Sequence, residues 1–410
     1  MGPLPATDGR NAVGEGTIAW LLVSSALVLF MTPGLALFYG GMVRSKNVLN
    51  MLMKNFITIG IVTVVWTLVG YSIAFGSDHG GLIGGLDLVG LDGVEGDALL
   101  FMVFQMMFAI ITPALISGAV AERMKFSAWV LFTTLWALIV YPIVAHWAFA
   151  ADGWMYAWGV RDFAGGLVVH INAGIAALAL VFALGPRKGF GAESMKPHSL
   201  PLTLLGTGIL WFGWFGFNAG SALAADGLAI NAFVTTQIAA AVATLAWVVA
   251  EWLRTGRPTM LGAASGAVSG LVAITPAAGF VSPMAAMVIG AVAGVVCYRA
   301  VSLKFRFGFD DSLDVVGVHL VGGIVGSLAV GVFASAAINP GVTDGLIGGG
   351  VGLLAKQAVA VAAVMAFTFV VTFLLARVVK AIAGLRVDDD QEHHGLDISL
   401  HEERGYVLTD

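Results

Sequence analysis

The feature that most constrains this chain is a succession of eleven long apolar segments separated by short polar breaks. Most of them come close to the roughly 20 residues that a helix needs to span a bilayer. Inside lipid, only a helix satisfies its backbone hydrogen bonds within a single segment. The pattern therefore predicts an all-α polytopic membrane protein with eleven transmembrane helices, at about residues 17–41, 56–76, 99–121, 126–149, 164–184, 200–220, 230–253, 260–275, 283–302, 315–337 and 351–378.

The composition of the 410 residues excludes several other classes of protein. Apolar residues make up 59% and charged residues only 11%, whereas a soluble protein has about 25% charged residues. A net charge of −5 without a basic stripe argues against a nucleic-acid partner. The single cysteine, Cys297, leaves no disulfide framework and no thiolate zinc site. We predict a protein whose surroundings are the lipid bilayer, without metal or cofactor and without enzymatic activity.

The distribution of basic residues predicts the orientation in the membrane. With the N-terminus outside, 17 of the 20 Lys and Arg residues fall in cytoplasmic loops, and only Arg10, Arg161 and Lys356 lie on the outer side. Cytoplasmic loops carry an excess of Lys and Arg, so we expect an outer N-terminus and a cytoplasmic tail, in the inner or plasma membrane of the cell. A cleaved leader is the alternative for the first apolar run, but that run is long and ends at a basic loop.

An odd number of helices in each half suggests an inverted repeat. Two sets of five helices would lie in opposite orientations, which is a common plan in transporters. We therefore expect two inverted five-helix repeats plus a C-terminal helix. The corresponding divisions are an extracellular N-terminus at 1–16, the first repeat at 17–184, a cytoplasmic linker at 185–199, the second repeat at 200–337, the last helix at 351–385 and a cytoplasmic regulatory tail at 386–410.

Two histidines occupy matching places in the expected repeats. His170 lies in the fifth apolar segment, eight residues after Asp162, and His319 lies in the tenth, five residues after Asp314. Ionisable residues inside a membrane are costly and usually functional, although a hydrogen-bonded core histidine is the plain alternative. Two neutral imidazoles can share one proton between them. The pair suits a small polar molecule or a proton relay.

Aromatic residues form a second group of candidates. Phe104 and Phe108 are four residues apart and share a helix face. Further aromatic residues crowd the end of the sixth segment and are followed by Ser221. Aromatic stripes are usually core or membrane-belt residues, but an aromatic cup with a hydroxyl can also hold an ammonium-like cation by cation–π attraction.

At these residues the sequence resembles the ammonium transporter family, which includes the Amt, Mep and Rh proteins, and is most similar to its Amt members. The resemblance covers nearly the whole chain. Several long motifs occur in the family's order, at residues 38–44, 104–108, 162–174, 185–187, 211–221, 310–319 and 395–398.

The resemblance implies a homotrimer with one narrow pore in each subunit. It makes His170 and His319 the twin pore histidines and Phe108 and Phe217 the gate. It assigns to the outer ammonium recruitment site the residues Phe104, Phe149, Trp214, Ser221 and, with a mainly architectural role, Asp162.

One position departs from the family's pattern. The family usually has a Trp three residues after the histidine that corresponds to His146, and this chain has Phe149 there. A Phe face attracts cations less than a Trp face does, so this departure bears on the affinity of recruitment. A shifted alignment with the family would instead place Trp147 or Trp154 at the position of the family's Trp.

The resulting functional hypothesis is ammonium uptake. Ammonium is recruited at the outer vestibule and deprotonated, and ammonia passes through an apolar pore, with a separate proton transfer along the histidines and methylammonium as an analogue. The alternatives are an ammonium sensor that signals to a cytoplasmic partner and a passive ammonia or gas channel. The resemblance also implies a PII-type signalling protein at the cytoplasmic face.

Overall fold

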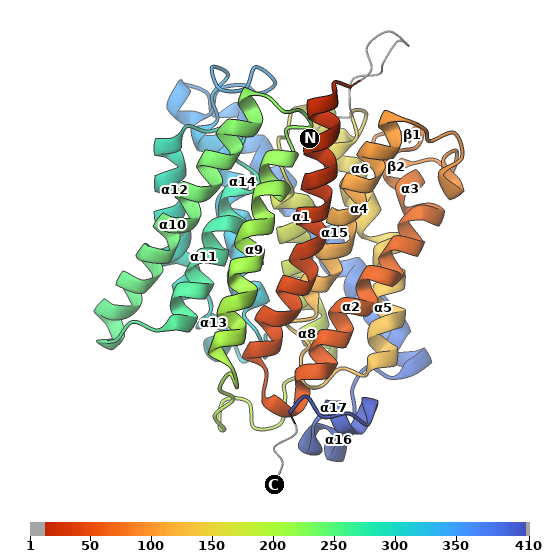
Figure 1. Ribbon diagram of the computed structural model, residues 1–410, viewed down its shortest axis with the longest axis vertical. Helices are drawn as coiled ribbons and strands as arrows, with labels where there is room; N and C mark the ends of the chain where they lie inside the picture. Colours follow the sequence, from red (N-terminus) through yellow and green to blue (C-terminus); the bar gives the residue numbers. More distant parts are fainter. Residues whose placement is uncertain (1–12, 407–410) are drawn as a thin grey trace.

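The computed structural model describes residues 13–406, and within them the predicted all-α membrane fold is confirmed (Figure 1). Ten helical segments are long and apolar enough to cross a membrane, and α11 (Met260–Ile274) is a shorter apolar helix at the eighth predicted position. The predicted N-terminal segment 1–16 lies mostly outside the described residues, as do the last four residues of the predicted tail.

The first half of the chain contains five membrane segments, several of them built from consecutive helices. Between α3 and α4 lies a short hairpin of β1 (Asp78–His79) and β2 (Ile83–Gly84), followed by the single turn η3 (Val89–Leu91). The helices are α1 (Glu15–Met42), η1 (Ser45–Asn47), α2 (Val48–Val65), η2 (Trp66–Gly70), α3 (Tyr71–Phe75), α4 (Asp97–Ile116), α5 (Phe126–Ile139), α6 (Tyr141–Phe149), α7 (Trp154–Trp158), η4 (Gly166–Ile171) and α8 (Asn172–Leu184).

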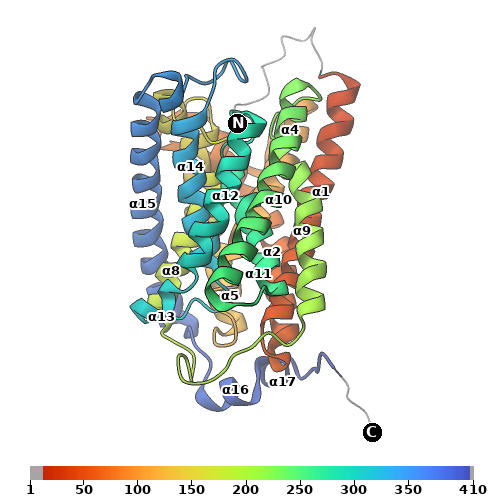
Figure 2. The same cartoon turned by 90° about the vertical axis from the view of Figure 1, so that its left-hand side faces the viewer.

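The second half repeats this plan and ends with the long helix α15 and two short tail helices. The helices are α9 (Leu200–Gly220), α10 (Gly227–Thr255), α11, α12 (Pro283–Ala300), α13 (Leu303–Phe307), η5 (Val316–Leu320), α14 (Val321–Phe333), η6 (Leu346–Gly348), α15 (Gly352–Ala383), α16 (Asp389–His394) and α17 (Leu396–His401). Figure 2 shows α14 and α15 on one side of the bundle and α1 and α9 on the other.

The two halves are related by matching local geometry around the histidines. His170 and His319 both lie in π-helical turns, η4 and η5, that precede α8 and α14. The α14 helix packs against η4, and α8 packs against η5. This reciprocal packing is what an inverted repeat produces, because each half supplies the same element to the other.

Close helix packing at the centre depends on glycine. A Cβ atom at Gly174 in α8 would lie 2.5 Å from the backbone nitrogen of Leu320 and 2.7 Å from its Cα atom. Backbones that approach this closely are typical of membrane helix interfaces with small residues. Gly174 therefore fixes the distance between α8 and the turn that carries His319.

Gly174→Ala should push α8 away from η5 and destabilise the protein by about 1–3 kcal/mol, the usual cost of overpacking. The measurement is the thermal midpoint in detergent, together with ammonium uptake. Gly60→Ala is the matched control, because Gly60 is in α2 and a Cβ atom there meets nothing within 4 Å. Equal midpoints for the two variants would contradict the packing role of Gly174.

The second segment begins earlier than the sequence predicted, at residue 48 rather than 56. The polar residues that made the start of α2 look like a loop are buried within the protein, among them Lys54 and Asn55, which are 0% exposed. The Lys54 ammonium donates a hydrogen bond to the carbonyl of Met124. The start of α2 can therefore be helical despite its low hydropathy, because its polar side chains are buried within the protein.

The tail lies against the bundle rather than free in solution. The carboxylate of Asp397 accepts hydrogen bonds from the backbone of Leu49 and Asn50 at the start of α2. Glu392, 3% exposed, accepts from the guanidinium of Arg386. The end of the bundle that carries α16 and α17 is called the tail side below, and Figure 1 shows it opposite the start of α1.

Candidate pore and its ionic support

The two histidines meet in the interior, as the sequence predicted. The Nδ1 atoms of His170 and His319 are 3.3 Å apart, and the side chains are 1% and 3% exposed. Their rings are nearly parallel, with an interplanar angle of 22°. At this distance one nitrogen donates and the other accepts, because two imidazolium rings would repel each other strongly in a buried site.

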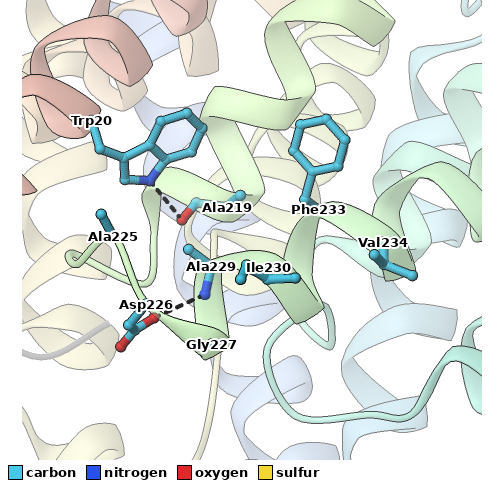
Figure 3. A pocket seen from close by; sticks show the side chains of 9 residues that line it. All are labelled: Trp20, Ala219, Ala225, Asp226, Gly227, Ala229, Ile230, Phe233 and Val234. Atoms are coloured by element: carbon cyan, nitrogen blue, oxygen red, sulfur yellow. Dashed lines mark hydrogen bonds between the residues drawn. The ribbon is translucent and has the colours of Figure 1, made fainter. Parts of the chain in front are cut away.

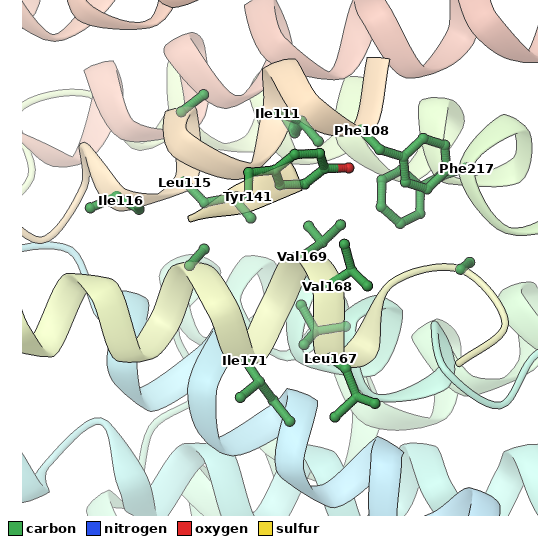
Figure 4. Close-up of a cluster of buried hydrophobic side chains, with 14 of the residues drawn as sticks. Phe108, Ile111, Leu115, Ile116, Tyr141, Leu167, Val168, Val169, Ile171 and Phe217 are labelled. Carbon is green, nitrogen blue, oxygen red and sulfur yellow. The ribbon is translucent and has the colours of Figure 1, made fainter. Parts of the chain in front are cut away.

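A row of aromatic rings leads to the histidines. Phe104 contacts Phe108 at 5.0 Å between ring centroids, and Phe108 stacks on Phe217 at 4.2 Å and 28°. Phe217 in turn lies 6.0 Å from His170. Figure 4 shows the rings of Phe108 and Phe217 placed against each other. The stacked pair lies on the side of the histidines away from the tail, where the sequence predicted a gate.

Beyond the ring pair lies a narrow apolar cavity that contains both histidines. Its volume is about 10 Å³, which is near the smallest that holds one water molecule. Apart from the imidazoles the lining is apolar, contributed by Met31, Leu35, Phe38, Ile111, Leu115, Val169, Leu210, Trp214, Phe217 and Val268. Such a space suits a small neutral molecule, since a bare ion would find few ligands in place of its lost water.

Trp214 lies with the histidines rather than at the outer site where it was expected. Its indole stacks on His170 at 5.4 Å and 16°, and its N–H donates to the hydroxyl of Thr275. Trp214 precedes Phe217 by three residues on α9, so it lies about 4.5 Å nearer the tail side. Thr275, which orients the indole, was not singled out from the sequence.

Asp162 has an architectural position. Its two carboxylate oxygens accept hydrogen bonds from four successive backbone N–H groups at the start of η4, those of Gly165, Gly166, Leu167 and Val168, at 2.7–3.2 Å. These four bonds match the roughly four lone-pair sites of a carboxylate. The carboxylate therefore fixes the turn that carries His170.

The remaining predicted recruitment residues are only partly brought together. Ser221 ends α9, and its hydroxyl donates to the carbonyl of Phe217, which leaves its oxygen lone pairs available. Phe149 is fully buried at the end of α6, and within residues 13–406 no ring pairs with it. Trp147 does not replace it, because it packs on Trp154 and Phe367.

The counterpart of Asp162 in the second half is Asp311 rather than Asp314, the aspartate noted before His319 in the sequence. Asp311 is eight residues before His319 and accepts hydrogen bonds from the backbone of Val315 and Val316. Asp314 has a positive φ of 64°, and Gly165, also five residues before its histidine, has a φ of 115°. The equal spacing of eight residues was available in the sequence and would have found Asp311.

A buried ionic cluster supports the pore on the tail side. The Arg187 guanidinium donates to both oxygens of Asp310 at 2.8 and 2.9 Å and to Glu122 at 3.0 Å. Arg44 also donates to Glu122, and Arg123 donates to the hydroxyl of Ser312. The cluster ties together the loops that follow α1, α4, α8 and α13, which hold η5 and hence His319 in place.

The carboxylates of this cluster should make the protein acid-sensitive. Burial alone raises the pKa of Glu122 and of Asp310, but the neighbouring guanidinium groups more than offset this and hold both pKa values below the ordinary range: those of Arg187 and Arg44 at Glu122, and those of Arg187 and Arg123 at Asp310. A lowered folded pKa gives stability that is complete above the unfolded pKa, near 4, and is lost as the pH falls through the folded pKa.

We expect the thermal midpoint in detergent to be nearly constant between about pH 5 and pH 7 and to fall below about pH 4. Glu122→Gln should start from a lower midpoint at pH 7 and fall less in acid, since one of the two carboxylates no longer titrates. Parallel curves for the two proteins would show that the acid sensitivity arises elsewhere.

A larger groove lies on the outer surface of the bundle and is separate from the pore. It is apolar, has a volume of about 600 Å³ and runs between α1, α9 and α10. Figure 3 shows the Trp20 indole donating to the carbonyl of Ala219 and Asp226 accepting from Ala229 at the start of α10. Its polar groups are thus used within the protein, so size alone does not make it the functional site.

The fold and the pore together define a multi-pass membrane protein with two inverted halves and a buried histidine pair between them. The model of the Ammonium Transporter Family matches residues 19–406, and the chain belongs to this family.

Known relatives agree with this assignment over 90% or more of their lengths. The chain is 52% identical to an ammonium transporter of Mycobacterium tuberculosis (strain ATCC 25618 / H37Rv), covering 95% of this chain and 90% of that protein. It is 50% identical to the ammonium transporter Amt1 of Archaeoglobus fulgidus, covering 96% and 100%. The crystal structure of the N240A mutant of Candida albicans Mep2 superimposes with a TM-score of 0.91 at 33% identity, covering 98% and 95%. A structure described as a sensor Amt protein gives 0.87 at 30% identity, covering 94% and 98%.

Proposed function

We propose that this protein transports ammonium across the cell membrane by conducting ammonia past His170 and His319. The observation that carries the proposal is the 3.3 Å contact between their Nδ1 atoms in an apolar cavity behind the stacked rings of Phe108 and Phe217. An apolar constriction offers ammonium no replacement for its water, so shedding a proton lowers the cost of passage. The proton follows separately along the imidazole pair.

The side away from the tail is the proposed outer side, in the inner or plasma membrane. There Phe104 and Ser221 are the proposed recruitment residues, together with Phe149 at the end of α6, and Phe108 and Phe217 are the proposed gate. The 17-to-3 distribution of basic residues supports this orientation. Asp162 supports the site through the turn it caps.

The test is the ammonium-induced current in proteoliposomes of the purified protein. We expect a current that methylammonium reduces by competition and that potassium neither carries nor blocks. Potassium has no proton to shed, so it should not enter the conduction path. Absence of any ammonium-dependent flux would refute transport.

Two other functions use the same site. A sensor is favoured by the likeness to the sensor Amt protein structure, and a pure receptor would bind ammonium without passing current. A passive ammonia channel would give flux that does not respond to membrane voltage. The proteoliposome measurement separates all three.

Phe149→Trp should strengthen recruitment. A Trp face attracts a cation more strongly than a Phe face, and a gain of about 0.5–1 kcal/mol corresponds to a half-saturating ammonium concentration that is roughly two- to fivefold lower. The measurement is the concentration dependence of the current, with unchanged maximal current as the control for folding. An unchanged or higher half-saturating concentration would remove Phe149 from the recruitment site.

We also propose that three copies assemble through the face formed by α1, α9 and α10. Gln237 is exposed on α10 in the middle of a membrane segment and accepts a hydrogen bond from Trp211. A polar amide on a membrane surface is better covered by protein than by lipid. The mass of the purified protein in detergent, corrected for bound detergent, should equal three chains.

A PII-type signalling protein is the proposed cytoplasmic partner. The tail and the linker already meet on the tail side, where the Glu392 carboxylate accepts from the backbone of Lys188 and from the Arg386 guanidinium. Together they present a structured surface for docking. No binding of a purified PII protein to the intact transporter would contradict this part of the proposal.

A further inference from the structure

Tyr141 is a buried polar residue that the mechanism above does not use. It begins α6, its side chain is 0% exposed, and its hydroxyl makes no hydrogen bond to any residue between 13 and 406. Buried polar groups nearly always have a partner, either in the protein or in an ordered water molecule. A tyrosine hydroxyl both donates and accepts, so it can hold a water molecule and still orient that water's oxygen.

The direction of this hydroxyl is fixed by packing. Ring contacts hold Tyr141 against Trp66, at 5.8 Å between centroids, and against Trp136, at 6.5 Å. Figure 4 shows the hydroxyl directed toward the rings of Phe108 and Phe217. The hydroxyl oxygen, the only polar atom of the Tyr141 side chain, therefore faces the ring pair of Phe108 and Phe217.

The hydroxyl is buried, and one carboxylate near it would attract a cation. The carboxylate of Asp162 acts electrostatically on Tyr141, and α6 packs against the turn that Asp162 caps. The oxygens of Asp162 already accept four backbone N–H groups. The hydroxyl is thus a buried polar group near the proposed gate that no residue of the described chain occupies.

We propose that Tyr141 is a further substrate-binding residue: its hydroxyl holds one water molecule whose oxygen accepts a hydrogen bond from ammonium at the ring pair of Phe108 and Phe217, before ammonium gives up its proton. The inference rests on the proposed transport function and adds a specific ligand to it. At the ring pair ammonium has lost most of its water, and a single well-placed acceptor lowers the cost of this loss. No bond is made or broken in this step.

The test compares Tyr141→Phe with the unchanged protein in the same proteoliposome assay. The variant keeps the ring contacts with Trp66 and Trp136 and removes only the hydroxyl. We expect the ammonium current to fall about tenfold, as for the loss of one hydrogen bond to a charged group, while the thermal midpoint stays equal or rises. A wild-type current in Tyr141→Phe would overturn the inference.

Thr133→Val is the matched control. Thr133 lies in α5, is 0% exposed and also has a hydroxyl without a hydrogen-bond partner in the described chain. This variant should carry the wild-type current. An equal loss in both variants would show a general effect of removing buried hydroxyls and would also overturn the inference.

The failure of the inference can be told apart from the failure of the transport function. If the unchanged protein carries no ammonium current, the proposed function fails and the inference fails with it. If the unchanged protein carries current and Tyr141→Phe does as well, only the inference fails. A high-resolution experimental map should show a water molecule within hydrogen-bond distance of the Tyr141 hydroxyl, and a map without one would likewise overturn the proposal.

Discussion

Replacing both histidines, His170→Ala with His319→Ala, should abolish selective ammonium transport. Among the described residues that line the narrow cavity, only the two imidazoles and the Trp214 indole carry polar side-chain atoms, and the indole N–H is already bonded to Thr275. Without them the dehydrated molecule has no hydrogen-bond partner along the path, and no shared proton links the two sides. Leaving a buried polar group without its partner costs about 1–3 kcal/mol, so the loss of both sites should reduce the current by at least about 30-fold.

The measurement is growth on low ammonium in a cell without its own transporters, followed by current in proteoliposomes. The single variants show whether the pair acts as one unit. Since each Nδ1 atom is the partner of the other, either single replacement should cost nearly as much as the double one. Undiminished, still selective transport in the double variant would refute the role proposed for the pair.

Removing Arg187 should have the largest effect on stability. In Arg187→Ala, the buried Asp310, 1% exposed, loses the two hydrogen bonds from the guanidinium and keeps the one from the backbone N–H of residue 187, and Glu122 loses one hydrogen bond. Breaking a buried ion pair by removing one partner typically costs about 3–5 kcal/mol, because the remaining charge stays desolvated. We expect poor expression or a markedly lower thermal midpoint.

The neighbouring residue provides the control. Lys188 pairs with Asp389, but both side chains are largely exposed, at 53% and 73%. An exposed pair contributes only about 0–1 kcal/mol, so Lys188→Ala should behave like the unchanged protein. Similar midpoints for Arg187→Ala and Lys188→Ala would show that the cluster does not support the fold.

The sequence was sufficient for the membrane segments and for the histidine pair, because apolar length and the position of a charge-bearing residue in a lipid-embedded helix are strong signals. The sequence predicted the helix bounds less well where polar residues of a helix are buried inside the protein. The start of α2 looked like a loop because Lys54 and Asn55 are polar, and only the tertiary structure shows that they are buried.

The sequence indicated which residues belong to the candidate site better than it indicated where each one lies along the axis of the bundle. Trp214 and Phe217 share a motif and lie about one turn apart on α9. Phe217 stacks on Phe108, whereas Trp214 stacks on His170. The apolar lining from α1 and α4 carried no signal at all, because Met31 and Ile111 look like any other residues of a membrane helix. Tyr141 was overlooked for the same reason.

The π-helical turns at the histidines have a consequence for how much the family's architecture can change. Each turn contains one residue more than an α-helix of the same rise requires, as the bond from the N–H of His170 to the carbonyl of Gly165 shows. Deleting a single residue from either turn would rotate the following side chains by about 100°. Insertions and deletions next to residues 170 and 319 should therefore be tolerated far less than substitutions. They would turn one imidazole away from the other while leaving the helix itself intact.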